Sequence, residues 1–405
     1  MSPRPGPGIP EGTRFVGPEA VARRRQALAA LRDLYGSWGY QPVEVPALER
    51  FDPEHPRTSQ SFKLTDRDGS VLALRSDFTP ALAQWVAAEH PAAAAGEGET
   101  LRLSYDGPAW HFIDPELARV REFTQVGIEL VGASNPRADA ELIHLARESL
   151  RAVGLTPRVE VGNPAYVRAL IEAAGVPADR EVAVADAIDR KDRSELLALV
   201  GELGIKGSAA DALVAAPDLY GDAGVLEVAK AGAPSPSARA ALRRLQGVME
   251  EFEDASELLL DLGMARRLSY YTGVTFRAYT FDFGQPLLGG GRYDGSLLPY
   301  AAGFSLGLER LLLAASQANG RSGVSAVSGP VQGVYSLDDV SARRLRAAGI
   351  SVVRSLAPDR ASAEHESRAA GGRFLVADSG VVPLTEDESG LGPLIELLGA
   401  ERSDG

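Results

Sequence analysis

Apolar residues recur at the spacing of a helix or of a strand over the first part of the chain. From Pro18 to Trp38 the helical spacing predicts a helix that ends at Gly39. Residues 41–48 predict a strand at the edge of a sheet or at an interface, because Pro46 cannot donate to a sheet ladder. Residues 61–75 predict a hairpin, since two strand-like runs flank an Asp-Gly turn.

The following segments alternate between helical and strand-like patterns. Helices are predicted over Thr79–Glu89 and Asp139–Val153. Strands are predicted over Leu101–Pro108 and Glu122–Val131. The segment Ala109–Arg121 is then the loop that joins these two strands.

A long region rich in Ala and Leu, at about residues 163–254, is almost entirely helical in pattern. It predicts a helical insertion in an otherwise α+β domain. Strand patterns return at Tyr270–Phe283 and Gly303–Leu306, and a helix is predicted from Leu308 to about Gln317.

The chain is expected to divide into two domains. Residues 318–329 are rich in Gly, Ser and Ala and predict a linker. After it, short strands and helices alternate up to Ala377, which predicts a small α/β unit. The expected division is a core domain over 1–317, the linker over 318–329, and a C-terminal domain over 330–405.

Composition excludes several classes of function. The formal charge of -13, from 42 Lys and Arg against 55 Asp and Glu, provides no broad basic surface for a nucleic-acid backbone. Cysteine is absent and the histidines form no i, i+4 pair, so we expect neither a disulfide framework nor a metal site. No segment approaches the ~18 apolar residues that span a bilayer. The N-terminal residues lack the apolar run of a signal peptide, so we expect a cytoplasmic protein.

Two clusters of polar residues are candidates for ligand binding. Asp77 and Thr79 follow a predicted strand and offer an acid and a hydroxyl to an ammonium group, although either is also a suitable helix N-cap. Strand alternation places Gln125 and Glu129 on one face beside Gly127, which leaves room for a ligand. A solvated sheet face would alternate polar residues in the same way.

Three later segments supply further candidates for ligand binding: charged groups, aromatic rings, and glycines that allow the backbone to come close to a ligand. The segment 266–273 combines arginines with Tyr270 and Tyr271, which are suited to wall a small-molecule pocket. The glycine run at 289–291 permits close backbone approach, although such a run taken alone predicts a turn. Arg310 lies in the first turn of a predicted helix, where a salt bridge or a surface charge is the alternative role. No P-loop and no strand-bound G-x-G-x-x-G motif is present.

Taken together and in this order, the segments resemble histidyl-tRNA synthetase, a class II synthetase, over roughly residues 10–317. Residues 39–46 are similar to motif 1, which builds the class II dimer. Ala109–Glu129 is similar to motif 2, and Gly303–Arg310 to motif 3. The resemblance implies an α+β fold: a class II synthetase-like antiparallel sheet with flanking helices, a helical insertion and a small C-terminal α/β domain.

Two further signatures resemble the histidine branch of that family. They are Arg-x-Leu-x-Tyr-Tyr-Thr-Gly at 266–273 and Gly-Gly-Arg-Tyr-Asp-Gly at 290–295. Arg267 and Ser269 depart from the Gly and Asp of the family's pattern. Residues 330–405 resemble a shortened anticodon-binding domain with little positive charge on the predicted helix near 365–370.

The nucleotide side of the synthetase pattern is degraded. His111 stands where a class II arginine holds the α-phosphate of ATP, and Ile113 stands at the following acidic position. A largely neutral imidazole lacks the permanent bidentate grip of arginine. The loop at 114–118 is acidic and repels phosphate. Arg121 and Arg310 remain as remnants of the nucleotide site, and the resemblance implies that tRNA is not a partner.

The amino-acid side of the pattern is retained. The residues that the resemblance implies for histidine binding are Asp77, Thr79, Gln125, Glu129, Arg266, Tyr270 and Tyr271. Leu-Arg-Ser-Asp-Phe-Thr-Pro at 74–80 is similar to the Leu-Arg-Pro-Asp-x-Thr-Pro of the regulatory subunits of ATP phosphoribosyltransferase, which are paralogues of the synthetase.

This second resemblance implies a non-catalytic regulatory subunit with no catalytic residue, no metal and no cofactor. Its expected partners are the short catalytic subunit of ATP phosphoribosyltransferase, a second copy of itself within a hetero-oligomer, and histidine as a possible ligand; no membrane is expected. The alternatives are a divergent active histidyl-tRNA synthetase and a free-standing histidine-sensing or histidine-activating paralogue. Whether histidine occupies the synthetase-like pocket or a subunit interface stays open.

Overall fold

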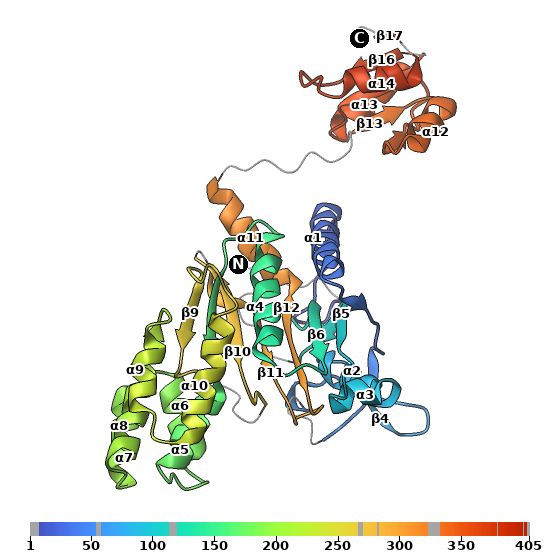
Figure 1. Ribbon diagram of the computed structural model, residues 1–405. Coiled ribbons are helices and arrows are strands. Elements are labelled where there is room, and N and C mark those ends of the chain that lie inside the picture. The colour runs from blue at the N-terminus through green and yellow to red at the C-terminus, as the bar shows by residue number, and fades with distance from the viewer. Residues whose placement is uncertain are drawn as a thin grey trace. The chain divides into compact units, whose positions relative to one another are not determined.

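A computed structural model of the 405-residue chain describes residues 8–53, 58–112, 120–265, 270–281, 283–322, 333–378, 380–399 and 401–402. The chain forms two compact units, Met1–Ser322 and Gly323–Gly405. Figure 1 shows the elements of each unit. In the described ranges no helix is both long enough and apolar enough to cross a membrane.

The first unit is built on a nine-stranded sheet. In spatial order its strands are β1 (Gln41–Pro42), β5 (Leu101–Trp110), β6 (Glu122–Val131), β12 (Ala301–Gly307), β11 (Phe283–Arg292), β10 (Thr275–Thr280), β7 (Arg158–Gly162), β9 (Leu258–Asp261) and β8 (Tyr220–Gly221). Neighbours from β5 to β7 pair antiparallel, whereas β1 pairs parallel with β5 and β7 pairs parallel with β9. The central part is therefore the antiparallel sheet that the sequence predicts.

One face of this sheet is covered by three helices, α1 (Pro18–Ser37), α4 (Pro136–Arg151) and α11 (Leu308–Ser322). The apolar residues of β6 that face them, Val126, Ile128 and Leu130, are fully buried in the main core. Because side chains alternate along a strand, Gln125 and Glu129 must project from the opposite face. The burial of the apolar side chains on one face of β6 thus fixes the direction in which Gln125 and Glu129 point.

The opposite face carries smaller elements near β5 and β6. They are a three-stranded sheet of β2 (Leu48–Arg50), β4 (Val71–Leu74) and β3 (Lys63–Thr65), a 3₁₀ turn η1 (Thr58–Gln60), and the helices α2 (Thr79–Glu89) and α3 (Pro91–Ala95). The hairpin β3–β4 and the helix α2 lie where the sequence predicts them.

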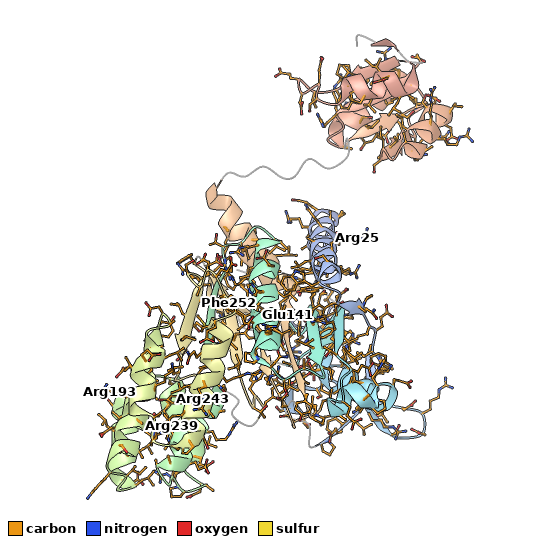
Figure 2. The ribbon with its side chains drawn as sticks, in the orientation of Figure 1. Arg25, Glu141, Arg193, Arg239, Arg243 and Phe252 are labelled. Carbon is orange, nitrogen blue, oxygen red and sulfur yellow. The ribbon has the colours of Figure 1, made fainter. Side chains whose placement is uncertain are left out.

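The helical insertion lies between β7 and β9. It contains α5 (Pro164–Ala173), α6 (Glu181–Asp189), α7 (Arg193–Glu202), α8 (Ser208–Ala215), η2 (Ala216–Asp218), α9 (Val225–Gly232) and α10 (Pro236–Met249), with the short strand β8 within it. These helices form one bundle beside the β9 end of the sheet (Figure 1). Figure 2 marks its exposed arginines Arg193 on α7 and Arg239 and Arg243 on α10.

Three sequence predictions need correction. The glycine run at 289–291 is not a turn but lies within β11, paired on both sides. A Cβ at Gly290 would collide with Phe304 and the backbone of β12, so the strands meet this closely only at glycine. Residues 41–48 divide between β1 and β2, which belong to different sheets; β1 is at the edge of its sheet, and Pro46 lies between the two strands. Helix α11 continues to Ser322, past the predicted start of the linker.

The second unit is a small α/β fold. Its elements are β13 (Val334–Ser336), α12 (Asp339–Ala347), β14 (Val352–Arg354), α13 (Arg360–Ala369), β15 (Phe374–Ala377), β16 (Gly380–Pro383), α14 (Leu391–Leu398) and β17 (Glu401–Arg402). The sheet order is β14-β13-β15-β16-β17, with β13 parallel to both of its neighbours. The alternation of strands and helices matches the sequence pattern up to Ala377.

Candidate functional site

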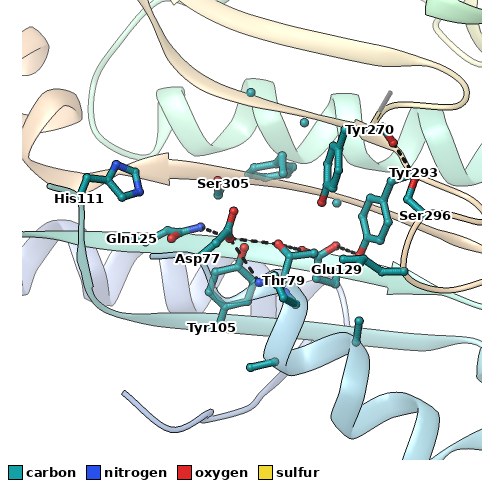
Figure 3. Close-up of a pocket in the computed structure, with 18 of the residues that line it drawn as sticks. Asp77, Thr79, Tyr105, His111, Gln125, Glu129, Tyr270, Tyr293, Ser296 and Ser305 are labelled. Atoms are coloured by element: carbon teal, nitrogen blue, oxygen red, sulfur yellow. Dashed lines mark hydrogen bonds between the residues drawn. The ribbon is translucent and has the colours of Figure 1, made fainter. Parts of the chain in front are cut away.

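A cleft of about 2080 Å³ lies on the sheet face opposite α4 and is lined by the polar face of β6, the start of α2, and β10, β11 and β12. Figure 3 shows a row of polar side chains along its floor, with His111 at one end and Tyr293 at the other. Pockets that bind a single drug-sized ligand have volumes of roughly 300 to 1,000 Å³. The cleft is therefore larger than an amino acid requires.

The floor of the cleft is a continuous chain of hydrogen bonds. Gln125 Nε2 donates to Asp77 Oδ1 at 3.0 Å. Thr79 Oγ1 lies 3.2 Å from the same Asp77 atom and 3.0 Å from Glu129 Oε1. Tyr293 OH donates to Glu129 Oε2 at 2.6 Å. Four of the residues predicted for the site, Asp77, Thr79, Gln125 and Glu129, are thus brought together.

Two local features of the backbone place these groups. The turn that begins α2 folds back so that the Thr79 amide donates to Asp77 Oδ1 at 3.3 Å, which gives Asp77 a cap-like role besides its place in the cleft. Across the sheet, Gly303 of β12 pairs with Glu129 of β6. A Cβ at Gly303 would collide with the Glu129 carboxylate, so glycine makes the space that this side chain fills.

Burial changes the ionisation of Glu129. The side chain is 2% exposed, and desolvation raises the pKa of Glu129 to about 8, with a further contribution from the charge of Asp77. The hydroxyl of Thr79 carries one hydrogen and contacts both carboxyl groups. Both contacts are hydrogen bonds when Glu129 is protonated and donates to Thr79, which in turn donates to Asp77. Near neutral pH Glu129 therefore keeps its proton and donates it to the Thr79 hydroxyl.

This ionisation predicts a stability change with pH. The folded pKa of about 8 exceeds the unfolded value of 4.5, so the stabilising contribution of protonated Glu129 is complete below pH 4.5 and is lost as pH rises through 8. Glu129→Gln resembles the protonated acid and does not titrate. In urea unfolding from pH 5 to pH 8, the stability of this variant should rise relative to the natural protein by about 1.4 kcal/mol per pH unit. A constant difference would contradict the raised pKa.

Tyrosine rings form the wall at one end of the row. The rings of Tyr270 and Tyr293 stack with centroids 5.6 Å apart, and Tyr271 lies edge-on to Tyr270 at 5.0 Å. Tyr270 and Tyr271 line the cleft as predicted, whereas Arg266 lies outside the described residues. Tyr293 was not among the predicted histidine-binding residues, although it follows the arginine of the Gly-Gly-Arg-Tyr-Asp-Gly signature.

Buried Tyr105 was also missed. Strand alternation places it on the Gln125 face of the sheet, and its ring stacks on Phe78 at 4.5 Å beneath the cleft. Its position on the predicted strand 101–108 was the signal that would have identified it. The same face carries two buried polar atoms that have no hydrogen-bond partner among the described residues, the Tyr105 hydroxyl and Gln125 Oε1. An unpaired buried acceptor fits a ligand that brings an N–H donor.

At the other end of the cleft, the described residues include His111 and Arg310, and each of them is bonded to a backbone carbonyl. His111 Nε2 lies 2.9 Å from the carbonyl oxygen of Ser76, so this nitrogen carries a hydrogen and donates to the backbone. Arg310 lines the cleft, and its guanidinium donates to the Pro286 carbonyl at 3.1 Å. Arg121 does not line the cleft; its guanidinium lies over the Phe112 ring at 4.8 Å. Ile113 lies outside the described residues.

The arrangement is suited to a small cationic ligand with an aromatic part. Two carboxyl groups and an amide oxygen are placed for an ammonium group, and the tyrosine wall is placed for a ring. Across the described parts of the chain, no group of three or more His, Asp or Glu side chains is placed to hold a metal ion.

Comparison with known proteins adds two kinds of similarity. The family model for histidyl-tRNA synthetase matches residues 12–311. A protein of Thermus thermophilus named ATP phosphoribosyltransferase regulatory subunit is 48% identical over 305 residues, covering 75% of this chain and 82% of that protein. One of the same name from Deinococcus radiodurans is 41% identical, covering 90% of this chain and 87% of that protein.

Solved structures extend the similarity to the whole fold. A structure from Bacillus halodurans, described as an ATP phosphoribosyltransferase regulatory subunit/histidyl-tRNA synthetase, superposes with a TM-score of 0.78 at 25% identity. The match covers 93% of this chain and 99% of that one. A histidyl-tRNA synthetase from Nostoc has a TM-score of 0.73 at 19% identity, with 93% of each chain covered, and shares the fold.

Proposed function

The chain belongs to the histidyl-tRNA synthetase family and, within it, to the ATP phosphoribosyltransferase regulatory subunits, and from this premise we propose that it activates a short catalytic subunit and mediates feedback by histidine. The observation that carries the proposal is the contrast between the two ends of the cleft. The amino-acid end keeps its acids and amide, whereas the nucleotide end has His111 bonded to a backbone carbonyl.

Histidine fits the retained end group by group. Its ammonium would lie between Asp77 and Glu129 and donate to the unpaired Gln125 Oε1. Its imidazole would pack on the wall formed by Tyr270 and Tyr271. Arg266, which follows Ala265 in the chain, is the proposed partner of the carboxylate. In this proposal Glu129 releases its proton when the ammonium group binds.

The proposed partners are the catalytic subunit and a second copy of this chain. The relatives' name implies a complex with an ATP phosphoribosyltransferase catalytic subunit. We place the homodimer contact at the motif 1 segment, residues 39–46, by analogy with class II synthetases. Neither tRNA nor a membrane is a proposed partner, and we place the complex in the cytoplasm.

The chain is not expected to activate histidine as an adenylate. Adenylate formation relies on fixed positive charge at the phosphorus, and one lost donor costs about 10²- to 10³-fold in rate. The His111 imidazole donates its Nε2 hydrogen to the Ser76 carbonyl, and Arg121 does not line the cleft. The purified protein should therefore show no histidine-dependent exchange of pyrophosphate into ATP. Rapid exchange at ordinary enzyme concentration would favour a divergent synthetase.

One variant tests whether the loss of a single arginine explains the expected lack of adenylate formation. His111→Arg restores the class II arginine but leaves Ile113 and the acidic residues 114–118 unchanged. We expect this variant to remain inactive in the exchange assay. The remaining alternative is a free-standing histidine sensor, which would elute alone in gel filtration. Co-elution with the catalytic subunit at micromolar concentration would exclude this alternative.

A further inference from the structure

Arg277 of β10 lines the cleft on the side that lies opposite Glu129 of β6. Residues that pair across neighbouring strands have their side chains on the same face of a sheet. From β6 to β10 the paired residues are Glu129, Gly303, Gly291 and Thr275. Arg277 lies two positions after Thr275 and therefore shares this face. Because β10 is three strand spacings, or about 14 Å, from β6, the cleft has an acid on one side and an arginine on the other.

The floor beside Arg277 is made of small residues. Gly289 of β11 pairs with Arg277 on one side and with Ser305 of β12 on the other, and all three residues line the cleft. A Cβ at Gly289 would have the Phe276 carbonyl oxygen, 3.9 Å away, as its nearest neighbour, so the space above this glycine is open. A ligand that lies on this part of the floor therefore reaches Arg277 without displacing a large side chain.

The hydrogen-bonding capacity of the Arg277 guanidinium is unused. Among the described residues it makes two ion contacts, from Nη2 to Glu160 Oε2 at 3.2 Å and to Asp261 Oδ2 at 3.8 Å, and it donates no hydrogen bond. Nε is buried without a partner, whereas the side chain as a whole is 25% exposed. An arginine carries five N–H donors in a planar fork, which binds a carboxylate or a phosphate through two parallel hydrogen bonds.

The two acids beside Arg277 have partners of their own. Asp261 Oδ1 accepts a hydrogen bond from Lys191 Nζ at 3.0 Å, and the charge of this lysine offsets that of Asp261. Glu160 Oε1 accepts a hydrogen bond from the Tyr220 hydroxyl at 3.1 Å. Glu160 is therefore the carboxylate with which a negatively charged ligand group competes for Arg277.

We propose that Arg277 forms a subsite for an oxyanion, the carboxylate or phosphate group of a ligand in the cleft. One source is the carboxylate of a histidine molecule whose ammonium group lies at the acids, with Arg277 acting in addition to Arg266. The other source is a phosphate group of a second molecule, for which a cleft of about 2080 Å³ has room. The inference rests on the proposed function only where histidine is used as a probe.

Titration calorimetry of the full chain with histidine, histamine and pyrophosphate separates the two sources, because histamine is histidine without its carboxylate. Arg277→Gln removes the charge and the fork, and Arg243→Gln, on the exposed side of α10 (Figure 2), is the control that removes the same charge. If the carboxylate of histidine is bound, Arg277→Gln should weaken histidine binding about 10- to 100-fold, the effect of losing a hydrogen bond to a charged group, and leave histamine unchanged. If a separate phosphate is bound, pyrophosphate should lose the same factor and histidine should not.

Glu160→Gln should change the affinity in the opposite direction. It removes the competing charge but keeps an oxygen for the Tyr220 hydroxyl, so the affected probe should bind about 2- to 5-fold more tightly, the size of a partly exposed ion pair. A purely structural role of Arg277 predicts no such gain. If Arg277→Gln does not fold, Arg277→Lys, which keeps the charge but lacks the fork, gives the same comparison with a smaller loss.

Unchanged histidine affinity in Arg277→Gln, together with pyrophosphate binding that is absent or unchanged, overturns the proposal. An equal loss of histidine and histamine affinity, with pyrophosphate unaffected, overturns it as well. Either result leaves the proposed function intact if the chain still activates the catalytic subunit. A chain that binds pyrophosphate through Arg277 but binds no histidine retains the subsite and contradicts the feedback role.

Discussion

Replacing either Asp77 or Glu129 with alanine is expected to weaken histidine binding to the isolated protein at least about tenfold, without unfolding it. Each change removes one of the two acids that share the Thr79 hydroxyl. The ammonium group of histidine would then keep only one carboxylate partner in a buried floor. Removing one partner of a buried polar contact costs about 1 to 3 kcal/mol, and more when a charge is left unpaired. Titration calorimetry on the folded variants measures the loss.

The control is an acid of the same type far from the cleft. Glu227→Ala, on α9, removes a side chain that is 77% exposed and should leave the affinity unchanged. Unchanged affinity in both Asp77→Ala and Glu129→Ala would place histidine elsewhere, at the interface with the catalytic subunit. The unfolding curve of each variant shows separately whether the variant folds. A change in histidine affinity can therefore be assigned to the lost side chain.

Glu129→Gln tests the proton exchange at the same site. Because the pKa of Glu129 is raised to about 8, the acid must lose its proton before it can pair with an ammonium group. Histidine affinity in the natural protein should therefore increase between pH 6 and pH 8 relative to Glu129→Gln measured on the same series. If the histidine affinities of the two proteins change in parallel with pH, Glu129 does not release its proton when histidine binds.

Local sequence pattern predicted the parts of the site that depend on a single element. Strand alternation placed Gln125 and Glu129 on one face of β6, because burial of Ile128 on the other face leaves no alternative register. The position of Asp77 and Thr79 beside them came from the family resemblance rather than from spacing. Their contacts with β6 join residues about fifty positions apart, and no periodicity carries that information.

The glycine run shows where local reasoning fails. A run of three glycines has a high propensity for turns, yet Gly290 lies in a central strand because β12 approaches it too closely for a side chain. That approach depends on the packing of neighbouring strands. Tyr293 was missed for a related reason: its hydroxyl reaches Glu129 across 164 positions of sequence. Side chains that converge from distant strands become visible only in the folded sheet.

Arg121 illustrates the limit of transferring a residue from a family. The motif 2 resemblance assigned it to the remnant nucleotide site, but its guanidinium lies over Phe112 and near Glu11 instead of lining the cleft. The neighbouring His111 is bonded to the Ser76 carbonyl, at the place that the resemblance gives to a phosphate-binding arginine.

The second large effect concerns the partner. As a regulatory subunit, the chain should affect catalysis when it is mixed with a short catalytic subunit that lacks its own regulatory domain. Allosteric coupling between sites is typically worth about 5- to 150-fold. We expect the rate of phosphoribosyl-ATP formation to rise at least about fivefold on mixing, and histidine to reverse the rise. The complex made with Glu129→Ala should still be activated but should resist histidine.

The most direct measurement of the central claim is the rate of phosphoribosyl-ATP formation by the short catalytic subunit, with and without an equimolar amount of this chain. We predict that the chain alone forms no product, that the mixture is faster than the catalytic subunit alone, and that histidine slows the mixture. A mixture no faster than the catalytic subunit alone, with the two proteins eluting separately in gel filtration, would contradict it.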